Sequence, residues 1–447
     1  MNTMFDWSGI FSTARIITVD DSIVRQKVTC HSSKSIGDYR SPFERDYGRV
    51  VYSSLFRRLA GKTQILPETG IDHVRNRLTH SIEVSNIAGS ILREVDRILV
   101  AKRGLRLHRL DDAYWVVRTA GLAHDIGNPP YGHAGEKAIR EWGERYFKKH
   151  PEFRMVAADF VHFDGNAQSF RLLSRNDLGV SDDVCLTATS LAAIVKYPYS
   201  VGDRRARGGK CNAFKTEADI LDAVMSQMNL GDTNGYFRRH PLSFVLEAAD
   251  DTSYNLSDLE DAVYMGIITQ EVKNGLFQEL LQRNSKPRKI SMSRSAMQSA
   301  VATVLIKGYA QAFVNSMEDV FTNRLFDGHA LEAALPKNIR EWLSEVDAIR
   351  EQIVSDLSVK GAEESGARLI KKMLDEMAEI VSYVGQGEDS KPEKRVLTLV
   401  KQTFGEEFFR VNRDRPKEWW LHAILDYVSG MTDAYLQKLG RSGASRG

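Results

Sequence analysis

Residues 77–99, RLTHSIEVSNIAGSILREVDRIL, carry the clearest structural pattern in the chain. Apolar side chains recur there at three- and four-residue steps, which is typical of an amphipathic helix with one face in a core. The recurring positions are Ile82, Val84, Ile87, Ala88, Ile91, Leu92, Val95 and Ile98. His80 falls on the same stripe, so its imidazole is expected to point inward. An imidazole inside a core needs a hydrogen-bond partner or a metal ion.

Helical patterns also prevail on both sides of this segment. We expect helices over about 113–124, 242–267, 296–325, 341–383 and 418–438, and a further helix that begins near His133. Alternating strand patterns are rare, apart from a hairpin expected around residues 14–28. The sequence therefore predicts an all-α fold.

Three polar segments are expected to be loops or linkers: 200–212, 283–294 and 385–394. The second, RNSKPRKISMSR, is basic. Charge runs of this kind are usually solvated surface loops, and the alternative is a contact with phosphate or nucleic acid.

The composition is that of an ordinary globular protein. Of 447 residues, 42% are hydrophobic and 27% are charged, which excludes collagen, an extended coil and a disordered chain. The formal net charge of +2 is too small for a polycation built to bind nucleic acid. The three cysteines form no CxxC pair, so neither a disulfide framework nor a cysteine-based zinc site is indicated. With no signal-peptide pattern and no long apolar run, we expect a cytoplasmic protein.

Histidines crowd between residues 73 and 162, where seven of the eleven lie. His124 ends the helix expected over 113–124, and Asp125 follows it at once. On its own, such a pair is more often a hydrogen-bonded core pair than a metal site.

The helix expected over 242–267 changes this interpretation. Its residues Asp250, Tyr254 and Asp258 are four apart and therefore line one face. Asp250 follows apolar residues, and a carboxylate in that environment is costly unless it meets a cation. A divalent metal ion held by His80, His124, Asp125 and Asp250 would supply one. This mixed nitrogen and oxygen set suits manganese, iron(II), magnesium or a catalytic zinc; the alternative is an acidic pair, Asp250 and Asp251, on a helix surface.

A tight turn, GNPPYG at 127–132, leads from Asp125 into the next helix. His133 and Glu136 are three residues apart at the start of that helix, so their side chains can hydrogen-bond. A histidine oriented by a carboxylate can act as a general acid or base. The alternative is a local interaction at a helix start.

Five motifs occur together and in order: RLTHSIEV (77–84), AHDIGNPPYGHAGE (123–136), HFDGNAQSFR (162–171), KYPY (196–199) and EAADDTSYNLSDLEDA (247–262). This set closely resembles the HD-domain deoxynucleoside triphosphate triphosphohydrolases, and within them the deoxyguanosine triphosphate triphosphohydrolases, or dGTPases. The likeness begins at SPFERDYGRVVYSSLFRRLAGKTQI (41–65) and ends near residue 270.

The resemblance implies a helical HD-domain catalytic core with additional C-terminal helices. We expect an N-terminal extension over 1–40, the core over 41–270 with a loop insertion near 197–240, and a C-terminal helical region over 271–447. The last region matches no motif that we can name.

The resemblance also implies an activity: metal-dependent hydrolysis of a deoxynucleoside triphosphate, preferentially dGTP, to the deoxynucleoside and inorganic triphosphate. Such an activity would control dNTP pools. A divalent ion (Mn²⁺, Mg²⁺ or Fe²⁺) would be bound by His80, His124, Asp125 and Asp250. His133 and Glu136 would form the catalytic dyad.

Seven further residues are implied in substrate binding: Gln64, Arg77, Asn166, Lys196, Lys210, Tyr254 and Asp258. Arg77, Lys196 and Lys210 would contact the phosphates, and Asn166 would lie near the phosphates or the catalytic histidine. Gln64 and Asp258 would bind the 3′ hydroxyl group. The Tyr254 ring would pack against the sugar where a ribose 2′ hydroxyl would collide. For Arg77, Lys210 and Asn166 the respective alternatives are a surface ion pair, a solvated lysine and a structural amide.

The resemblance further implies a homo-oligomer, with a hexamer as one form, and a nucleotide or single-stranded DNA as effector, without a membrane. Another HD-type phosphohydrolase, such as a 5′-nucleotidase or phosphodiesterase, would lack GNAQ, KYPY and the pair Tyr254 and Asp258. A non-catalytic protein that senses nucleotides or single-stranded DNA would have a degenerate site, whereas every expected ligand is present here.

Overall fold

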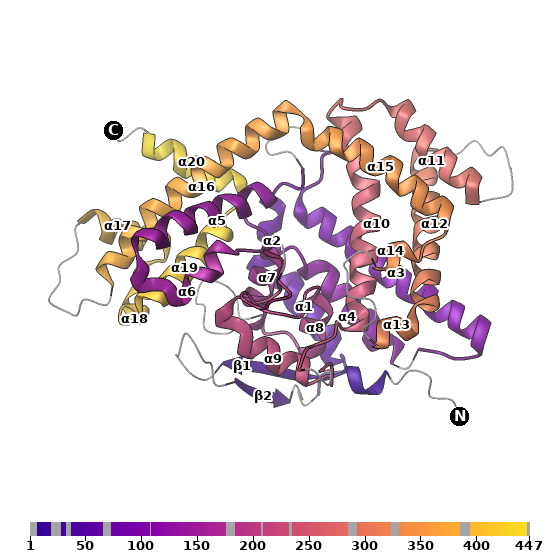
Figure 1. Ribbon diagram of the computed structural model, residues 1–447, viewed down its shortest axis with the longest axis horizontal. Coiled ribbons are helices and arrows are strands. Elements are labelled where there is room, and N and C mark those ends of the chain that lie inside the picture. The colour runs from indigo at the N-terminus through magenta and orange to yellow at the C-terminus, as the bar shows by residue number, and fades with distance from the viewer. Residues whose placement is uncertain are drawn as a thin grey trace.

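The computed structural model describes residues 7–18, 28–32, 37–65, 73–107, 109–175, 184–206, 209–231, 235–284, 293–322, 330–384 and 394–444. Within these ranges the chain forms helices α1 to α20, short 3-10 helices and one two-stranded sheet (Figure 1). The predicted all-α fold is confirmed.

The N-terminal segment is built into the body of the molecule. Its elements are η1 (Ser8–Ile10), β1 (Ala14–Thr18), β2 (Val28–Ser32), α1 (Pro42–Tyr52), α2 (Ser54–Arg58) and η2 (Leu59–Gly61). The strands pair antiparallel, with Ile16 opposite Cys30, so the expected hairpin is present and its second strand begins where the prediction ended. Trp7, Ile10 and Phe11 are buried in the larger apolar core.

The middle of the chain supplies the helices that carry the histidine and aspartate motifs. They are α3 (Arg77–Arg103), α4 (Leu110–Ala123), α5 (Gly132–Lys149), η3 (Pro151–Phe153), α6 (Arg154–Val161), α7 (Gly165–Ser174), α8 (Ala188–Ile194), η5 (Lys215–Glu217), α9 (Ala218–Ser226) and α10 (Pro241–Tyr264). Helix α3 begins with a capping box: Asn76 Oδ1 accepts from the Thr79 N–H (3.0 Å), and Thr79 Oγ1 accepts from the Asn76 N–H (3.2 Å). It packs against α4, α10 and α12.

The predicted apolar stripe of α3 is buried at every position but one. Ile82 is 49% exposed, and its inclusion in the stripe was wrong. Ile82 lies two residues after His80. This step rotates its side chain about 200° around the helix, away from the buried face.

The C-terminal part adds α11 (Gln270–Asn284), α12 (Arg294–Asn315), α13 (Met317–Thr322), α14 (Ala330–Ala333), α15 (Lys337–Ser355), α16 (Leu357–Tyr383), α17 (Lys394–Thr403), α18 (Glu406–Asn412), α19 (Lys417–Ser429) and α20 (Asp433–Ala444). The three helices expected over 296–325, 341–383 and 418–438 are each divided. The second breaks at Asp356, which is extended and whose carboxylate caps α16 by accepting from the Ser358 N–H (2.8 Å). Of the expected loops, 285–292 and 385–393 lie outside the described residues.

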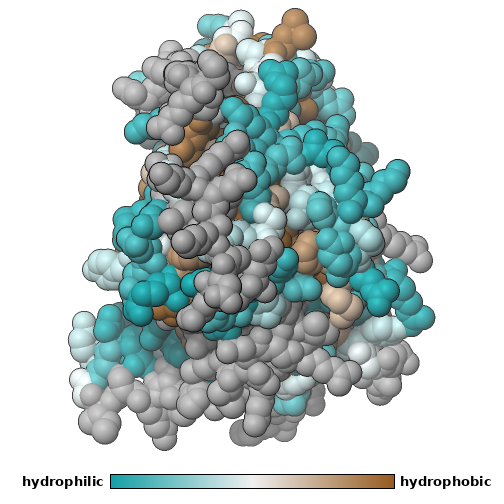
Figure 2. Space-filling view, turned by 90° about the vertical axis from the view of Figure 1, so that its left-hand side faces the viewer, coloured by the Kyte–Doolittle hydropathy of each residue, from teal (hydrophilic) through white to brown (hydrophobic). Residues whose placement is uncertain are grey.

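Apolar side chains form two clusters. The larger one includes buried residues of α1, α3, α4, α10, α12 and α15, and the smaller one joins α5, α6, α16, α19 and α20. Helices α15 and α16 run as an arch along the top of Figure 1 and connect the two sides. The side that Figure 2 shows is mostly hydrophilic where it is described, with small, scattered hydrophobic areas. No described helix combines the length and apolar character needed to cross a membrane.

Candidate active site

A cavity of about 500 Å³ opens where α3, α4, α5, α10, α15 and α16 meet. This volume is in the range of pockets that bind small molecules. All of the predicted site residues line it: Gln64, Arg77, His80, His124, Asp125, His133, Glu136, Asn166, Lys196, Lys210, Asp250, Tyr254 and Asp258. The structure therefore brings the motifs together in one place.

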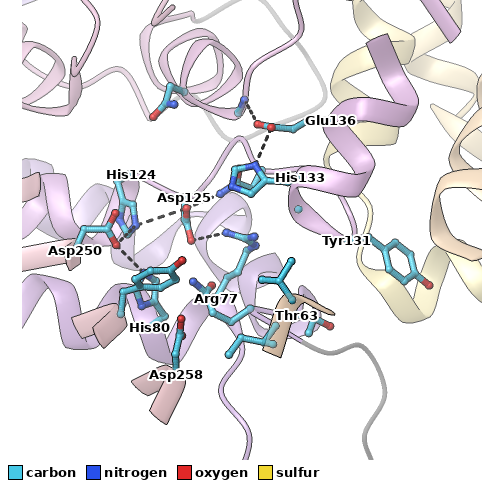
Figure 3. A pocket seen from close by; sticks show the side chains of 18 of the residues that line it. Thr63, Arg77, His80, His124, Asp125, Tyr131, His133, Glu136, Asp250 and Asp258 are labelled. Carbon is cyan, nitrogen blue, oxygen red and sulfur yellow. Dashed lines mark hydrogen bonds and ion pairs between the residues drawn. The ribbon is translucent and has the colours of Figure 1, made fainter. Parts of the chain in front are cut away.

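Two imidazoles and two carboxylates meet at one side of this cavity (Figure 3). His80 comes from the first turn of α3, His124 and Asp125 directly follow α4, and Asp250 comes from the middle of α10. Asp250 Oδ1 lies 3.0 Å from His80 Nε2 and 3.6 Å from His124 Nε2. Donor atoms of His80, His124 and Asp125 all lie within 4.8 Å of one another.

The hydrogen bonds of His124 favour a metal ion at this cluster. Its Nδ1 binds the Gly121 carbonyl oxygen at 2.8 Å. Its Nε2 is buried and has no hydrogen-bond partner among the described residues. An imidazole fixed through one nitrogen, with the other directed at carboxylates, is typical of a metal ligand. The residues therefore fit a divalent cation, whose identity the mixed donor set leaves open.

Both carboxylates of the cluster are held in the charged form. Burial alone would raise the pKa of Asp125, but the Arg77 guanidinium and the His124 imidazole outweigh it, so the pKa lies below its usual value. Burial acts on Asp250 in the same way, and the two imidazoles again bring its pKa below the usual value. Arg77 Nη1 lies 2.7 Å from Asp125 Oδ2, so Arg77 is a buried ion-pair partner rather than a surface one.

His133 and Glu136 form the expected hydrogen bond at the start of α5. His133 Nδ1 lies 3.0 Å from Glu136 Oε2, and Glu136 Oε1 accepts from the Gly165 N–H at 2.7 Å. A Cβ atom at Gly165 would lie 2.3 Å from Asn128 Oδ1, so a side chain there would obstruct this arrangement. Burial would raise the pKa of Glu136, but the hydrogen bonds from His133 and Gly165 lower it below its usual value. An anionic Glu136 thus holds His133 beside the cluster of histidines and aspartates (Figure 3).

Two lysines at the cavity each lie near a buried carboxylate. Lys196 Nζ lies 2.7 Å from Glu247 Oε1, and Lys210 Nζ lies 3.7 Å from Asp164 Oδ2. Asp164 Oδ1 also accepts from Asn166 Nδ2 at 2.8 Å. This role of Asp164 was not predicted from the sequence. Its place as the N-cap of α7, directly before Gly165, was a signal that could have found it.

The predicted sugar-binding residues leave two buried oxygens unpaired. Gln64 Oε1 and Asp258 Oδ1 have no hydrogen-bond partner among the residues described here, and both side chains line the cavity. A hydroxyl group of a ligand would satisfy such atoms. The Tyr254 ring is covered on one face by the Arg350 guanidinium, whose central carbon lies 3.6 Å from the ring centroid.

The cavity wall also contains residues that the sequence analysis did not identify. Arg350, Ile353 and Val354 come from α15, and Val359 and Glu363 come from α16. Periodicity predicts that Ile353 faces inward, but nothing in the sequence distinguishes Arg350 from other surface arginines. Other residues in the lining are Thr63, Ile65, Asn128, Tyr131, Gly132, Gly165, Tyr197 and Asp251.

Comparison with known proteins identifies the family. The family model of the HD domain matches residues 77–168, which contain His80, His124 and Asp125. A deoxyguanosinetriphosphate triphosphohydrolase-like protein of Pseudomonas aeruginosa (strain LESB58) is 30% identical over 93% of this chain and 96% of its own length. Proteins of the same name from Listeria innocua (30% identical, 90% of this chain and 93% of the relative) and Synechocystis sp. (34%, 66% and 71%) are also similar. The chain belongs to the HD-domain deoxynucleoside triphosphate triphosphohydrolase family.

Proposed function

We propose that this protein hydrolyses deoxynucleoside triphosphates, preferentially dGTP, to the deoxynucleoside and inorganic triphosphate, and that it thereby controls dNTP pools. One observation carries this proposal: His124 Nε2 is buried beside carboxylates, has no hydrogen-bond partner among the described residues, and shares a cavity with the pair His133 and Glu136. The names of the similar proteins support the choice of substrate.

In this proposal, His80, His124, Asp125 and Asp250 hold a divalent ion, Mn²⁺, Mg²⁺ or Fe²⁺. When bound, the ion supplies Lewis-acid stabilisation of the charge on phosphoryl oxygens. Arg77, Lys196 and Lys210 bind the triphosphate and offset its charge. The carboxylates of Glu247 and Asp164 lie next to Lys196 and Lys210, respectively, and keep both lysine side chains near the cavity.

The reaction forms a bond between a water oxygen and the α-phosphorus and breaks the bond from phosphorus to the 5′ oxygen. The water loses a proton, and the leaving 5′ oxygen gains one. Because Glu136 binds Nδ1 of His133, Nε2 is the atom that can transfer a proton. This nitrogen serves as the base toward water when neutral and as the acid toward the 5′ oxygen when protonated.

Sugar selection is assigned to Gln64, Asp258 and Tyr254. The 3′ hydroxyl group, which a deoxynucleotide retains, would donate its proton to Gln64 Oε1 and accept from Asp258, whose pKa burial raises well above its usual value. The Tyr254 ring would occupy the space of a ribose 2′ hydroxyl group. The proposed preference for guanine is supported by the names of the similar proteins.

The proposal is tested by incubating the purified protein with each of the four dNTPs and with GTP, in Mn²⁺ or Mg²⁺, and separating the products by ion-exchange chromatography. We expect triphosphate and deoxynucleoside from dGTP, and the loss of both products with a chelator. Triphosphate at equal rates from all four dNTPs would remove the dGTP preference. Release of monophosphate, or no release of product, would contradict the triphosphohydrolase activity.

We also propose a homo-oligomer and an effector that is a nucleotide or single-stranded DNA, as the family resemblance implies. Sedimentation velocity with and without added nucleotide would show the oligomer and its response. A monomer whose rate is unaffected by either class of effector would contradict this part of the proposal.

A further inference from the structure

Asp433, the first residue of α20, binds two separate segments of the cavity wall. Its Oδ2 accepts hydrogen bonds from the backbone N–H (2.8 Å) and the hydroxyl group (2.5 Å) of Thr63. Its Oδ1 accepts from the backbone N–H of Tyr131 at 3.1 Å. The side chain is almost completely buried, and the start of a helix is a favourable place for a carboxylate.

Each of the two segments leads directly into a group with a proposed role. Thr63 precedes Gln64, which is assigned to the 3′ hydroxyl group, and Tyr131 lies two residues before His133. The backbone of Tyr131 adopts the left-handed helical conformation, with φ 60°. This conformation is unfavourable for a residue with a side chain. The backbone before His133 therefore depends on contacts from elsewhere in the chain.

Those contacts come from the C-terminal helices. The Tyr131 hydroxyl group lies 3.0 Å from Gln437 Nε2 on α20. Its ring lies against Gly366 of α16, where a Cβ atom would come within 2.3 Å of the ring. Figure 3 shows the Tyr131 side chain directed away from the histidine and aspartate cluster, toward the C-terminal helices.

A second link runs beside the first. The Lys62 ammonium group is buried and donates to the carbonyl oxygens of Asn128 (2.5 Å) and Ser429 (2.7 Å). Ser429 is the last residue of α19, and Asn128 belongs to the turn that precedes Tyr131. The segments 62–64 and 128–133 are thus joined to each other and to the α19–α20 junction at two points.

We propose that Asp433 is a positioning residue that fixes the distance between the sugar contact at Gln64 and the proton-transfer group at His133. This inference rests on the proposed function of the same site. A carboxylate accepts all three hydrogen bonds, whereas the amide of Asn would place an NH₂ group opposite either the Thr63 donors or the Tyr131 N–H. Asp433→Asn therefore releases one segment relative to the other without removing any group that lines the cavity.

The test compares kcat/KM for dGTP and for 2′,3′-dideoxyGTP, which lacks the 3′ hydroxyl group. Since a small misplacement of reacting groups costs up to about 100-fold in rate, we expect Asp433→Asn to lower kcat/KM for dGTP by about 10- to 100-fold. The dideoxy substrate cannot use the Gln64 contact, so its loss should be smaller. The ratio of the two kcat/KM values should therefore fall toward 1, and metal content should stay at the wild-type level.

Asp426→Asn is the matched control. Asp426 is equally buried in α19 and accepts from Arg171 and Gln168, neither of which belongs to the described lining of the cavity. We expect this variant to be less stable but to keep the wild-type ratio. Thr63→Val, which removes only the hydroxyl donor, gives a milder second variant and should move the ratio in the same direction as Asp433→Asn.

The outcomes separate the two proposals. A wild-type protein that releases no triphosphate from dGTP would refute the proposed function itself. A wild-type protein that prefers dGTP over the dideoxy substrate, with the same ratio in Asp433→Asn and Thr63→Val, would overturn only the role of Asp433. A ratio that falls in Asp426→Asn as well would also overturn it, because the effect would then follow general loss of stability.

Discussion

Replacement of His133 would separate the proposed proton transfer from the proposed metal binding. It hydrogen-bonds Glu136 and is outside the proposed ligand set. We expect His133→Ala to lower kcat for dGTP by about 10²- to 10⁴-fold, the usual contribution of a general acid or base. Metal analysis of the same preparation should give a content close to that of the wild type. An unchanged kcat would remove His133 and Glu136 from the mechanism.

Tyr254 offers a second test at a single residue, since its proposed role depends on the ring and not on the hydroxyl group. We expect Tyr254→Ala to raise hydrolysis of GTP relative to dGTP, because the space for a 2′ hydroxyl group would open. Tyr254→Phe keeps the ring against Arg350 and should keep the wild-type ratio. Equal ratios in the wild type and Tyr254→Ala would show that another group excludes ribonucleotides.

The residues proposed to act on substrate were easier to predict than the residues that hold them. His80 lies on a helical stripe, and His124 and Asp250 lie in motifs, so spacing together with the family resemblance predicted that they meet. Asp433 lies in a region without a recognised motif, and its partners are distant in the sequence. Only the folded chain shows what it binds.

At the scale of helices, the crossing of α3 and α4 brings His80 close to His124. A Cβ atom at Gly121 of α4 would lie 2.6 Å from the Cα atom of Ser85 on α3. The backbones of α3 and α4 therefore lie so close together at this point that only a glycine fits. Since each helix carries one imidazole of the cluster, their separation controls the distance between the two nitrogen donors.

Gly121→Ala tests this dependence. The added methyl group must push the two helices apart, and such overpacking usually costs about 1–3 kcal/mol of stability. We expect a lower free energy of unfolding in urea and weaker binding of Mn²⁺ in a titration. Gly275→Ala in α11, where no atom lies within 4 Å of the new Cβ, should leave Mn²⁺ binding unchanged and gain up to about 1 kcal/mol. Wild-type affinity in Gly121→Ala would contradict the argument.

Apolar periodicity predicted the positions of the helices more accurately than it predicted their ends. The pattern over 341–383 remains helical through Asp356, because good helix formers stand on both sides of it. The break falls at Asp356, whose side chain caps α16, and the turn there places Arg350 and Glu363 in the cavity wall. Apolar periodicity alone does not distinguish an aspartate that caps a new helix from one inside a continuous helix.

For the molecule as a whole, the cavity lies between two apolar cores and depends on both. The larger core carries α3, α4 and α10 with the cluster of histidines and aspartates, and the smaller core carries α5 with His133. The arch of α15 and α16 spans them. The helices of the larger core that carry the histidines and aspartates were predicted from periodicity and also contain the motifs. The C-terminal helices, which complete the wall, carry only a general apolar pattern.

His240 links the N-terminal segment to this assembly and should make its stability depend on pH. Its Nε2 donates to the Ile10 carbonyl oxygen (3.0 Å), and its Nδ1 accepts from the Leu242 N–H (3.1 Å), so the folded protein requires a neutral imidazole. Burial lowers the pKa of His240 from 6.5 to about 4, although the hydrogen bond to Ile10 opposes this shift. Between these two values the unfolded chain binds a proton that the folded protein does not bind. The free energy of unfolding should therefore fall as pH falls through this range, by up to about 3 kcal/mol from this residue.

His240→Asn isolates this contribution, because an Asn can still cap α10 through the Leu242 N–H but does not titrate. Urea unfolding of both proteins at several values between pH 7 and pH 4 gives the comparison. The variant should be less stable at pH 7, since it lacks the contact with Ile10, and its stability should fall less steeply toward pH 4. The difference between the two curves should thus shrink as the solution is acidified. Parallel curves would mean that His240 binds a proton as readily in the folded protein as in the unfolded chain, and would contradict this prediction.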